Sequence, residues 1–226
     1  RWLIHPDPVG QLKQEILSKQ KALIVETPDT MLNLTVPSNV TGMDACWNEK
    51  VFCHGAANWH SPYLGWRCCY GPTVLGWHDR VASHFLTHAH PSRFTIDQQH
   101  GDGYIPAELH GSGFSYNMQE VAIDMILNDL EWTGDLKLAG EVFDRISKAL
   151  QYESRVFDPD GNGLYQNYLN TWASDGHAYN GGECAQASAY NYRANRLMGF
   201  IAEKLGRNPG HFISQADKIQ KAMQKS

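Results

Sequence analysis

The spacing of apolar residues along the chain is typical of helices. Apolar side chains recur three or four positions apart in several segments, and no run of alternating β-branched residues is present. The predicted helices span residues 9–25, 72–88, 116–131, 133 to about 150, about 183–205, and 209 to about 224. A further element begins at Thr27-Pro28-Asp29, with Thr27 as its cap, and is expected to be short or irregular before Pro37. The fold class is therefore predicted to be all-α.

The connections between these helices alternate between tight turns and long loops. Tight turns are expected at 132–135 and 206–209, and long loops at 41–70, 90–114 and 153–181. Antiparallel helix pairs joined in this way suggest a ring of helical hairpins with its long loops on one face. About seven helices fit in the chain, and a closed six-hairpin ring needs twelve. We therefore expect residues 1–226 to be a single helical domain that forms about half of a larger (α/α) hairpin toroid.

Composition narrows the classes of partner. The 226 residues carry 24 acidic and 19 basic side chains, and the net charge of −5 argues against a nucleic-acid binder that depends on phosphate neutralisation. No run of about 18 apolar residues is present, so no membrane span is expected. The sequence starts at Arg1 without a basic and apolar leader, which suggests a processed or excised piece. Five cysteines without a CxxC pattern are predicted to be mostly free, buried thiols.

Aromatic side chains are frequent for a chain with so few charges. The sequence has 7 Trp, 10 Tyr and 8 Phe, and charged residues make up 19%, below the roughly 25% typical of soluble domains. The aromatic residues gather mainly in the long loops at 46–70 and 157–179, together with carboxylates. Sugar rings stack their C–H faces on aromatic rings, and their hydroxyls bind carboxylates, amides and guanidinium groups. The loops therefore favour a carbohydrate ligand, and glycosidic cleavage would require two carboxyl groups among them.

The richest group of candidate side chains lies within residues 158–193. Residues 158–164 read DPDGNGL, Trp172 and Asp175 follow in a loop, and residues 187–206 have the pattern xxAYxYxAxxxxxxxAxxLG. This order resembles the catalytic stretch of the six-hairpin glycosidases, the nearest being the inverting glycoside hydrolase families 63 and 37. The resemblance implies that Asp175 is the general acid, although WASDGH replaces the SGWDxS of that clan and the following Arg is missing. It also implies that the general base lies beyond residue 226.

As a whole, the chain is similar to uncharacterised exported proteins of gut Bacteroidota that carry such a toroid. The shared motifs are ETPD, FxHG, GWR, LGWHDR and MQE, which stand at residues 26–29, 52–55, 65–67, 75–80 and 118–120. This similarity covers most of the chain. It implies a sugar-related role and an exported or periplasmic location.

We predict a glycoside hydrolase that acts on an oligo- or polysaccharide by inversion, with no cofactor. The catalytic candidates are Asp175, Glu120 and Glu183, and the substrate-binding candidates are Trp66, Arg67, Trp77, Asp79, Glu108, Trp172, His177 and Tyr179. Glu120 is expected near a helix start, with Asp124 four residues later on the same face. Structural roles remain open for several of these side chains. Asp175 would also serve as a helix cap, Glu183 as a first-turn carboxylate favoured by the helix dipole, and residues 77–80 as a solvated face.

Two patterns approach metal-binding motifs without completing them. Residues 158–163 match the first six positions of an EF-hand loop, but Leu169 stands at the twelfth position, where a bidentate Glu is needed. His84 and His88 are four residues apart, but the residues between them lack the Glu of HExxH. No metal is therefore predicted.

Other functions fit the same sequence features. A sugar epimerase or lyase could use this scaffold, since a fold does not fix a reaction. A non-catalytic carbohydrate-binding piece is the alternative from a different class. Its protein partner would be the rest of its own toroid or a second copy of the chain.

Overall fold

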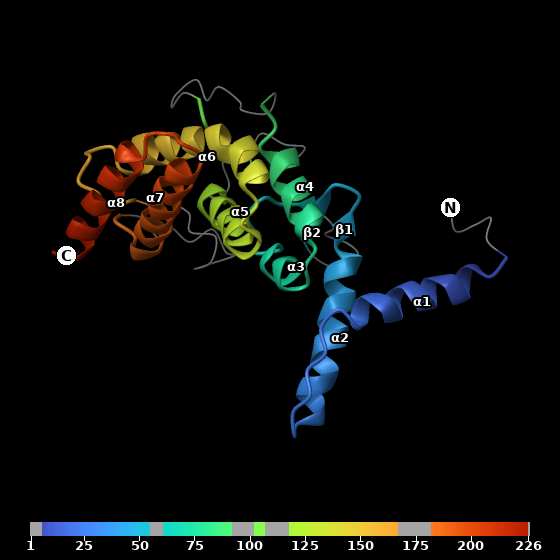
Figure 1. The fold of residues 1–226 in the computed structure, drawn as a ribbon. Coiled ribbons are helices and arrows are strands. Elements are labelled where there is room, and N and C mark those ends of the chain that lie inside the picture. Colours follow the sequence, from blue (N-terminus) through green and yellow to red (C-terminus); the bar gives the residue numbers. More distant parts are fainter. Residues whose placement is uncertain (1–5, 55–60, 92–101, 107–117, 167–181, 226) are drawn as a thin grey trace.

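The computed structural model describes residues 6–54, 61–91, 102–106, 118–166 and 182–225 (Figure 1). It is mostly helical, as the apolar spacing predicts. The helices are α1 (Pro8–Gln20), α2 (Thr30–Ala45), α3 (Tyr70–Val74), α4 (His78–His88), α5 (Gln119–Thr133), α6 (Leu136–Phe157), α7 (Ala185–Lys204) and α8 (Gly210–Met223).

A small antiparallel sheet lies within the aromatic stretch that the sequence predicts to be a loop. Its order is β1-β2-β3, and the strands are β1 (Trp47–Asn48), β2 (Val51–His54) and β3 (Ser61–Pro62). Trp47 is paired with Phe52, and Cys53 is paired with Pro62. Since most of β2 is buried and packs against α4, the sheet anchors this stretch to the helices.

One predicted helix is divided in the structure. The periodicity over residues 72–88 predicts a single helix, but α3 and α4 occupy this region. Gly76 has a φ of +73°, a left-handed conformation that follows the end of α3, and the Trp77 N–H donates to the Pro72 carbonyl oxygen at 2.8 Å. The chain thereby turns before α4 begins.

The second helix is longer than the sequence predicts. α2 passes through Pro37 and ends at Ala45. Its cap is Asp29, whose carboxylate accepts the Met31 N–H at 2.8 Å, and the predicted cap at Thr27 is wrong. Proline deprives a helix of one N–H donor. Only Val40 of α2 is buried, so the helix around Pro37 is not enclosed by other elements.

Two helical hairpins form much of the packed part of the molecule. α5 and α6 are joined at Gly134 (φ +64°), and α7 and α8 are joined by a segment that contains Gly206 (φ +68°). α5 is buried on most of its surface, whereas the buried residues of α6 recur on one stripe. α5 is therefore the more enclosed helix of its hairpin, and α6 has one face open to solvent.

The first helices of the two hairpins, α5 and α7, run parallel. Glu120 at the start of α5 interacts electrostatically with Cys184, the residue at the N-cap position of α7. Farther along, Arg193 of α7 forms ion pairs with Asp124 and with Glu131, near the end of α5. The starts of α5 and α7 therefore lie at the same end of the hairpins. A long connection precedes each of these helices and ends there.

One large apolar cluster connects the sheet with helices α4 to α8. Its members include Phe52, Phe85, Ile123, Ile146 and Phe212. Within the described ranges, the helices lack the combined length and apolar character needed to cross a membrane.

α1 and α2 form an arm that projects from the packed helices (Figure 1). Asp44 of α2 connects the two helices of the arm to α4. Its carboxylate accepts hydrogen bonds from Lys19 of α1 at 2.6 Å and from Arg80 of α4 at 2.8 Å. Large apolar side chains remain exposed along the arm: Val9, Leu12, Leu17, Ile24, Met31, Leu32 and Leu34.

Candidate functional site

The start of α5 is packed closely against an earlier segment of the chain. A Cβ atom at Gly65 would lie 2.5 Å from the Met118 carbonyl oxygen, so a larger residue would force the two segments apart. The segment after Gly65 leads into α3, whose Tyr70 reaches Asp124 on α5, 54 residues away in the sequence. Close backbone packing therefore places Tyr70 of α3 beside Asp124 of α5.

Glu120 is a buried carboxyl group in the first turn of α5. Only 4% of the residue is exposed, and its Oε2 atom has no hydrogen-bond partner within the part of the chain that the structure describes. Burial raises the pKa of Glu120 well above its usual range, and the nearby Glu153 and Cys184 raise it further. This environment favours the protonated, uncharged form of the side chain.

Gln119 holds the start of α5 and Glu153 of α6 in place. Its side-chain Nε2 donates to Glu153 Oε1 at 3.1 Å and to the Ala149 carbonyl oxygen at 3.2 Å. Its Oε1 accepts the Ile105 N–H at 2.6 Å. Both Gln119 and Glu153 are buried. The hydrogen bond from Gln119 therefore fixes the Glu153 carboxyl group of α6 beside the start of α5.

Asp124, one turn after Glu120, is surrounded by donors instead. The Arg193 guanidinium donates to Asp124 Oδ1 at 2.5 Å, and the Tyr70 hydroxyl donates to Oδ2. Arg193 also pairs with Glu131. Glu120 and Asp124 therefore lie on one helix face in different surroundings.

Two tyrosines stand beside this carboxyl pair. Burial raises the pKa of Tyr70 above its ordinary value, and Asp124 adds to the effect. Burial also raises the pKa of Tyr190, whose closest charged neighbours include Arg67 and Asp124. Both phenols therefore keep their protons at neutral pH and can donate hydrogen bonds. Arg67 is exposed and stands at the edge of the group.

We name Glu120, Asp124, Tyr70, Tyr190 and Arg193 the α5 carboxyl site. It combines a buried carboxyl group that favours its proton with a second carboxyl group that accepts from a guanidinium and a phenol. Acid catalysis at neutral pH requires a group that still holds its proton. The hydroxyl and guanidinium groups supply the donors that bind sugar hydroxyls.

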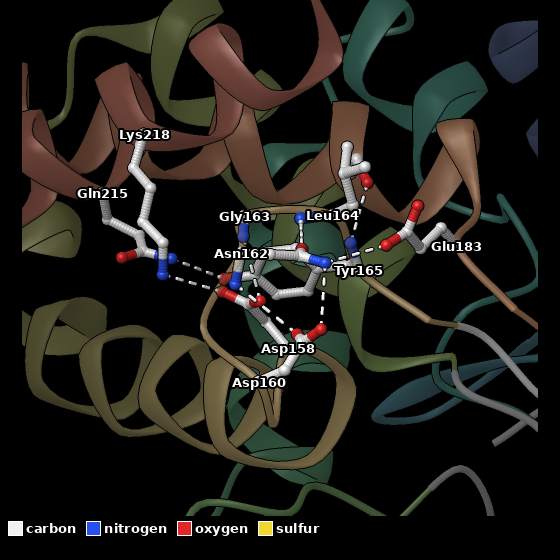
Figure 2. Close-up of polar contacts among 10 residues, drawn as sticks. Asp158, Asp160, Asn162, Gly163, Leu164, Tyr165, Glu183, Gln215 and Lys218 are labelled. Carbon is white, nitrogen blue, oxygen red and sulfur yellow. Dashed lines mark hydrogen bonds and ion pairs between the residues drawn. The ribbon is translucent and has the colours of Figure 1, made fainter. Parts of the chain in front are cut away.

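The DPDGNGL segment forms a tight loop between α6 and α7 (Figure 2). Asp158 Oδ1 accepts the Gly163 N–H at 3.0 Å, and Asp160 accepts from the Asn162 side chain at 3.0 Å. The Tyr165 N–H donates to Ser188 on α7 at 2.9 Å. The loop is thus held by its own Asx hydrogen bonds and by α7.

A lysine balances the charge of this loop. Lys218 of α8 lies 3.0 Å from Asp158 Oδ2, and the Asp158 side chain is fully buried (Figure 2). In an EF-hand the corresponding first carboxylate binds calcium. Here the ammonium group of Lys218 occupies one of its two oxygens and Gly163 the other, so the carboxylate is already satisfied by the protein.

The side chain of Glu183 bonds to the DPDGNGL loop. α7 begins at Ala185, so Glu183 precedes the helix, and the predicted first-turn position is wrong. Its side chain is exposed and accepts from Asn162 Nδ2 at 2.8 Å (Figure 2). Glu183 therefore closes the DPDGNGL loop onto the chain before α7.

Trp77 and Asp79 lie near the opposite end of α5 from Glu120. The neighbouring His78 contacts Asp129 Oδ1 at 2.8 Å, and Asp129 lies nine residues after Glu120, or about 14 Å along the helix. The Arg80 guanidinium group lies over the Trp77 ring, 4.6 Å from its centroid. Asp79 is exposed. The structure does not bring these two predicted binding residues to the carboxyl pair.

Trp66 is half-buried and lines a cavity that no residue of the α5 carboxyl site lines. Its ring stacks on His54, with 4.0 Å between the ring centroids, and meets Tyr63 edge-on at 5.8 Å. Asp175, Glu108, Trp172, His177 and Tyr179 lie outside the described residues, and their predicted roles stay predictions.

Three residues of the site, Tyr70, Tyr190 and Arg193, are not among those predicted from the sequence. A signal was present for two of them, because Tyr190 and Arg193 are three residues apart on a predicted helix and so share a face. Tyr70 stands at the end of an irregular stretch, where periodicity gives no direction. Its contact with Asp124 depends on tertiary packing alone.

One group of potential metal ligands comes together within the described ranges. The ligand atoms of Cys68, Cys69 and His84 all lie within 4.8 Å of one another. However, His84 Nδ1 accepts the Phe52 N–H at 3.0 Å, so the ring proton of the neutral imidazole is on Nε2, which faces the thiols. A protonated nitrogen cannot bind a metal, so the arrangement suits a hydrogen bond to sulfur better.

Comparisons of the chain with protein-family models, with curated proteins and with solved structures found no match.

Proposed function

We propose that the chain is a glycoside hydrolase-like protein that acts on an oligo- or polysaccharide. In this proposal its helical hairpins are part of an (α/α) toroid. The observation that carries the proposal is the pair on α5: Glu120, in an environment that favours the proton, and Asp124, which accepts from Arg193 and Tyr70. The parallel course of α5 and α7 supports the toroid, since successive hairpins of such a ring place their inner helices in this way.

The chemistry of glycosidic cleavage accounts for the two environments. The leaving oxygen needs a proton from an acid that still holds it at neutral pH, and burial beside Glu153 gives Glu120 that property. The sugar ring gains positive charge as the bond breaks, and Asp124, one helical turn from Glu120, would stabilise that charge. Cβ atoms four residues apart on a helix are about 5–6 Å apart, so both groups can act on one sugar unit.

A second candidate function is carbohydrate binding without catalysis. It is favoured by the burial of Glu120, whose exposed fraction of 4% means that a sugar reaches the carboxyl group only after covering side chains move. Arg67 is exposed and Tyr190 is half-buried, so a sugar can reach both side chains from the surface.

Hydrolysis and binding assays with a panel of oligo- and polysaccharides separate the two functions. For hydrolysis, Glu120→Gln should lower turnover about 100-fold or more, the usual range for loss of a general acid. The matched control is Glu203→Gln on the exposed surface of α7, which should retain wild-type turnover. Asp175→Asn, assayed in parallel, decides which of the two carboxyl groups donates the proton.

Two outcomes would contradict the proposal of hydrolysis. Wild-type turnover in both Glu120→Gln and Asp175→Asn would exclude both acids. If the wild-type chain binds sugar but turns over no member of the panel, and Arg67→Ala loses that binding, the binding function would replace hydrolysis.

A further inference from the structure

A cavity of about 560 Å³ lies between the end of α2, strand β2 and the segment before α3. It is separate from the α5 carboxyl site, because none of that site's residues lines it. Three thiols stand in its walls, those of Cys46, Cys53 and Cys68. The stacked rings of His54 and Trp66 form another part of the wall. The cavity therefore offers sulfur chemistry to a small molecule.

The Cys68 sulfur is surrounded by hydrogen-bond donors. It lies 3.6 Å from His84 Nε2 and 3.8 Å from the Cys69 sulfur. The Phe52 N–H fixes the proton of the neutral imidazole on Nε2, which also lies 3.3 Å from the Leu64 carbonyl oxygen. His84 is buried and held from both sides, so it presents an N–H to Cys68 without needing to reorient.

The two adjacent thiols differ in character. The hydrogen bond from Cys69, followed by the influence of His84, lowers the pKa of Cys68 well below its usual range. Burial raises the pKa of Cys69, which therefore keeps its proton and donates it to the Cys68 sulfur. Cys68 is half-buried and lines the cavity, whereas Cys69 is buried. The thiolate is thus placed on the accessible side of the pair.

The other two thiols that line the cavity do not oppose this assignment. Cys53 is buried on β2, and burial raises its pKa, so it remains a neutral thiol at the cavity wall. Cys46, at the end of α2, is half-buried like Cys68 and faces the same cavity, which makes it a matched internal comparison.

We propose that Cys68 is a nucleophilic thiolate that exchanges with low-molecular-weight disulfides entering this cavity. The Cys68 sulfur forms a bond with one sulfur of the incoming disulfide, the original S–S bond breaks, and the other half leaves as a thiolate that takes a proton from water. Cys68 is oxidised to a mixed disulfide, and the released half is reduced, so the disulfide supplies the oxidising equivalents.

Labelling of the intact, reduced chain tests the proposal. Oxidised glutathione and, separately, iodoacetamide are added at about pH 6, 7 and 8, and fragment mass spectrometry follows the modification of each cysteine. Cys68 should react first with both reagents, at least tenfold faster than Cys46 at about pH 6. An ordinary thiol gains about tenfold in rate per pH unit below its pKa of about 8.5, whereas Cys68 should change much less.

Initial reaction at Cys46 or Cys53, or a Cys68 rate that rises tenfold per pH unit, overturns the proposal. Cys69→Ala removes one donor and should move the Cys68 rate profile to higher pH, while Cys69→Ser keeps a hydroxyl donor and should move it less. A wild-type profile in folded Cys69→Ala contradicts the role of that donor. If circular dichroism shows that Cys69→Ala is unfolded, the comparison of Cys68 with Cys46 in the wild type decides.

Discussion

Replacing Glu120 with glutamine is expected to stabilise the chain at neutral pH relative to the wild type. In the wild type, burial raises the pKa of Glu120, and Glu153 adds to the effect. Glutamine has nearly the same shape as protonated glutamate and cannot ionise. The substitution therefore removes the free-energy cost of ionising a buried carboxyl group as the pH rises.

The sign and size of the effect follow from counting bound protons. An unfolded glutamate has a pKa of about 4.3, and folded Glu120 titrates at a higher pH. Between these values the folded state binds one more proton than the unfolded state, so the free energy of unfolding falls by about 1.4 kcal/mol per pH unit. The stability is fully present below the unfolded pKa and is lost as the pH rises to the folded pKa. The advantage of Glu120→Gln over the wild type should grow with the same slope.

Urea unfolding at a series of pH values from about 4 to 8, followed by circular dichroism, measures this advantage. Glu203→Gln on the exposed face of α7 is the control and should remain parallel to the wild type. The reasoning is refuted if Glu120→Gln also remains parallel to the wild type between about pH 4.5 and 6.5. In that case the buried carboxyl group would not bind the extra proton.

Gly65→Ala should destabilise the chain by about 1–3 kcal/mol, because the added Cβ would lie 2.5 Å from the Met118 carbonyl oxygen. Gly42→Ala is its control: no atom lies within 4 Å of that Cβ in the helix, so a gain of up to about 1 kcal/mol is expected, and equal shifts of the two urea midpoints would contradict the close packing. Lys218→Met should cost about 2–3 kcal/mol, since it leaves the buried Asp158 carboxylate without its cation. Adding Asp158→Asn should restore part of the thermal stability, and a double variant no more stable than Lys218→Met would show that Lys218 acts through other contacts.

The sequence predicts the helices of the two hairpins well because their apolar patterns are long. α6 carries a buried stripe over 22 residues, and α5 is apolar enough to be buried on most sides. The small sheet could not be predicted in the same way, because strands of two and four residues are too short to show alternation. The division at Gly76 and the passage of α2 through Pro37 are local exceptions to otherwise reasonable patterns.

The candidate site was predictable only as far as local spacing reaches. Glu120 and Asp124 share a helix face, which their separation of four residues indicates. The partners of Asp124 come from distant segments: Tyr70 is 54 residues and Arg193 is 69 residues away in the sequence. Likewise, Lys218 reaches Asp158 across 60 residues. Such pairings depend on how helices pack, and single-chain periodicity does not encode them.

Infrared spectroscopy of the native chain at neutral pH tests the central claim most directly, because it needs no substrate. A protonated carboxylic acid has a C=O stretch that is distinct from the bands of a carboxylate. The account predicts such a band in the wild type and in Glu203→Gln at about pH 7, and its loss in Glu120→Gln. A wild-type spectrum without the band, or one that Glu120→Gln leaves unchanged, would contradict the assignment of Glu120 as a proton-holding carboxyl group.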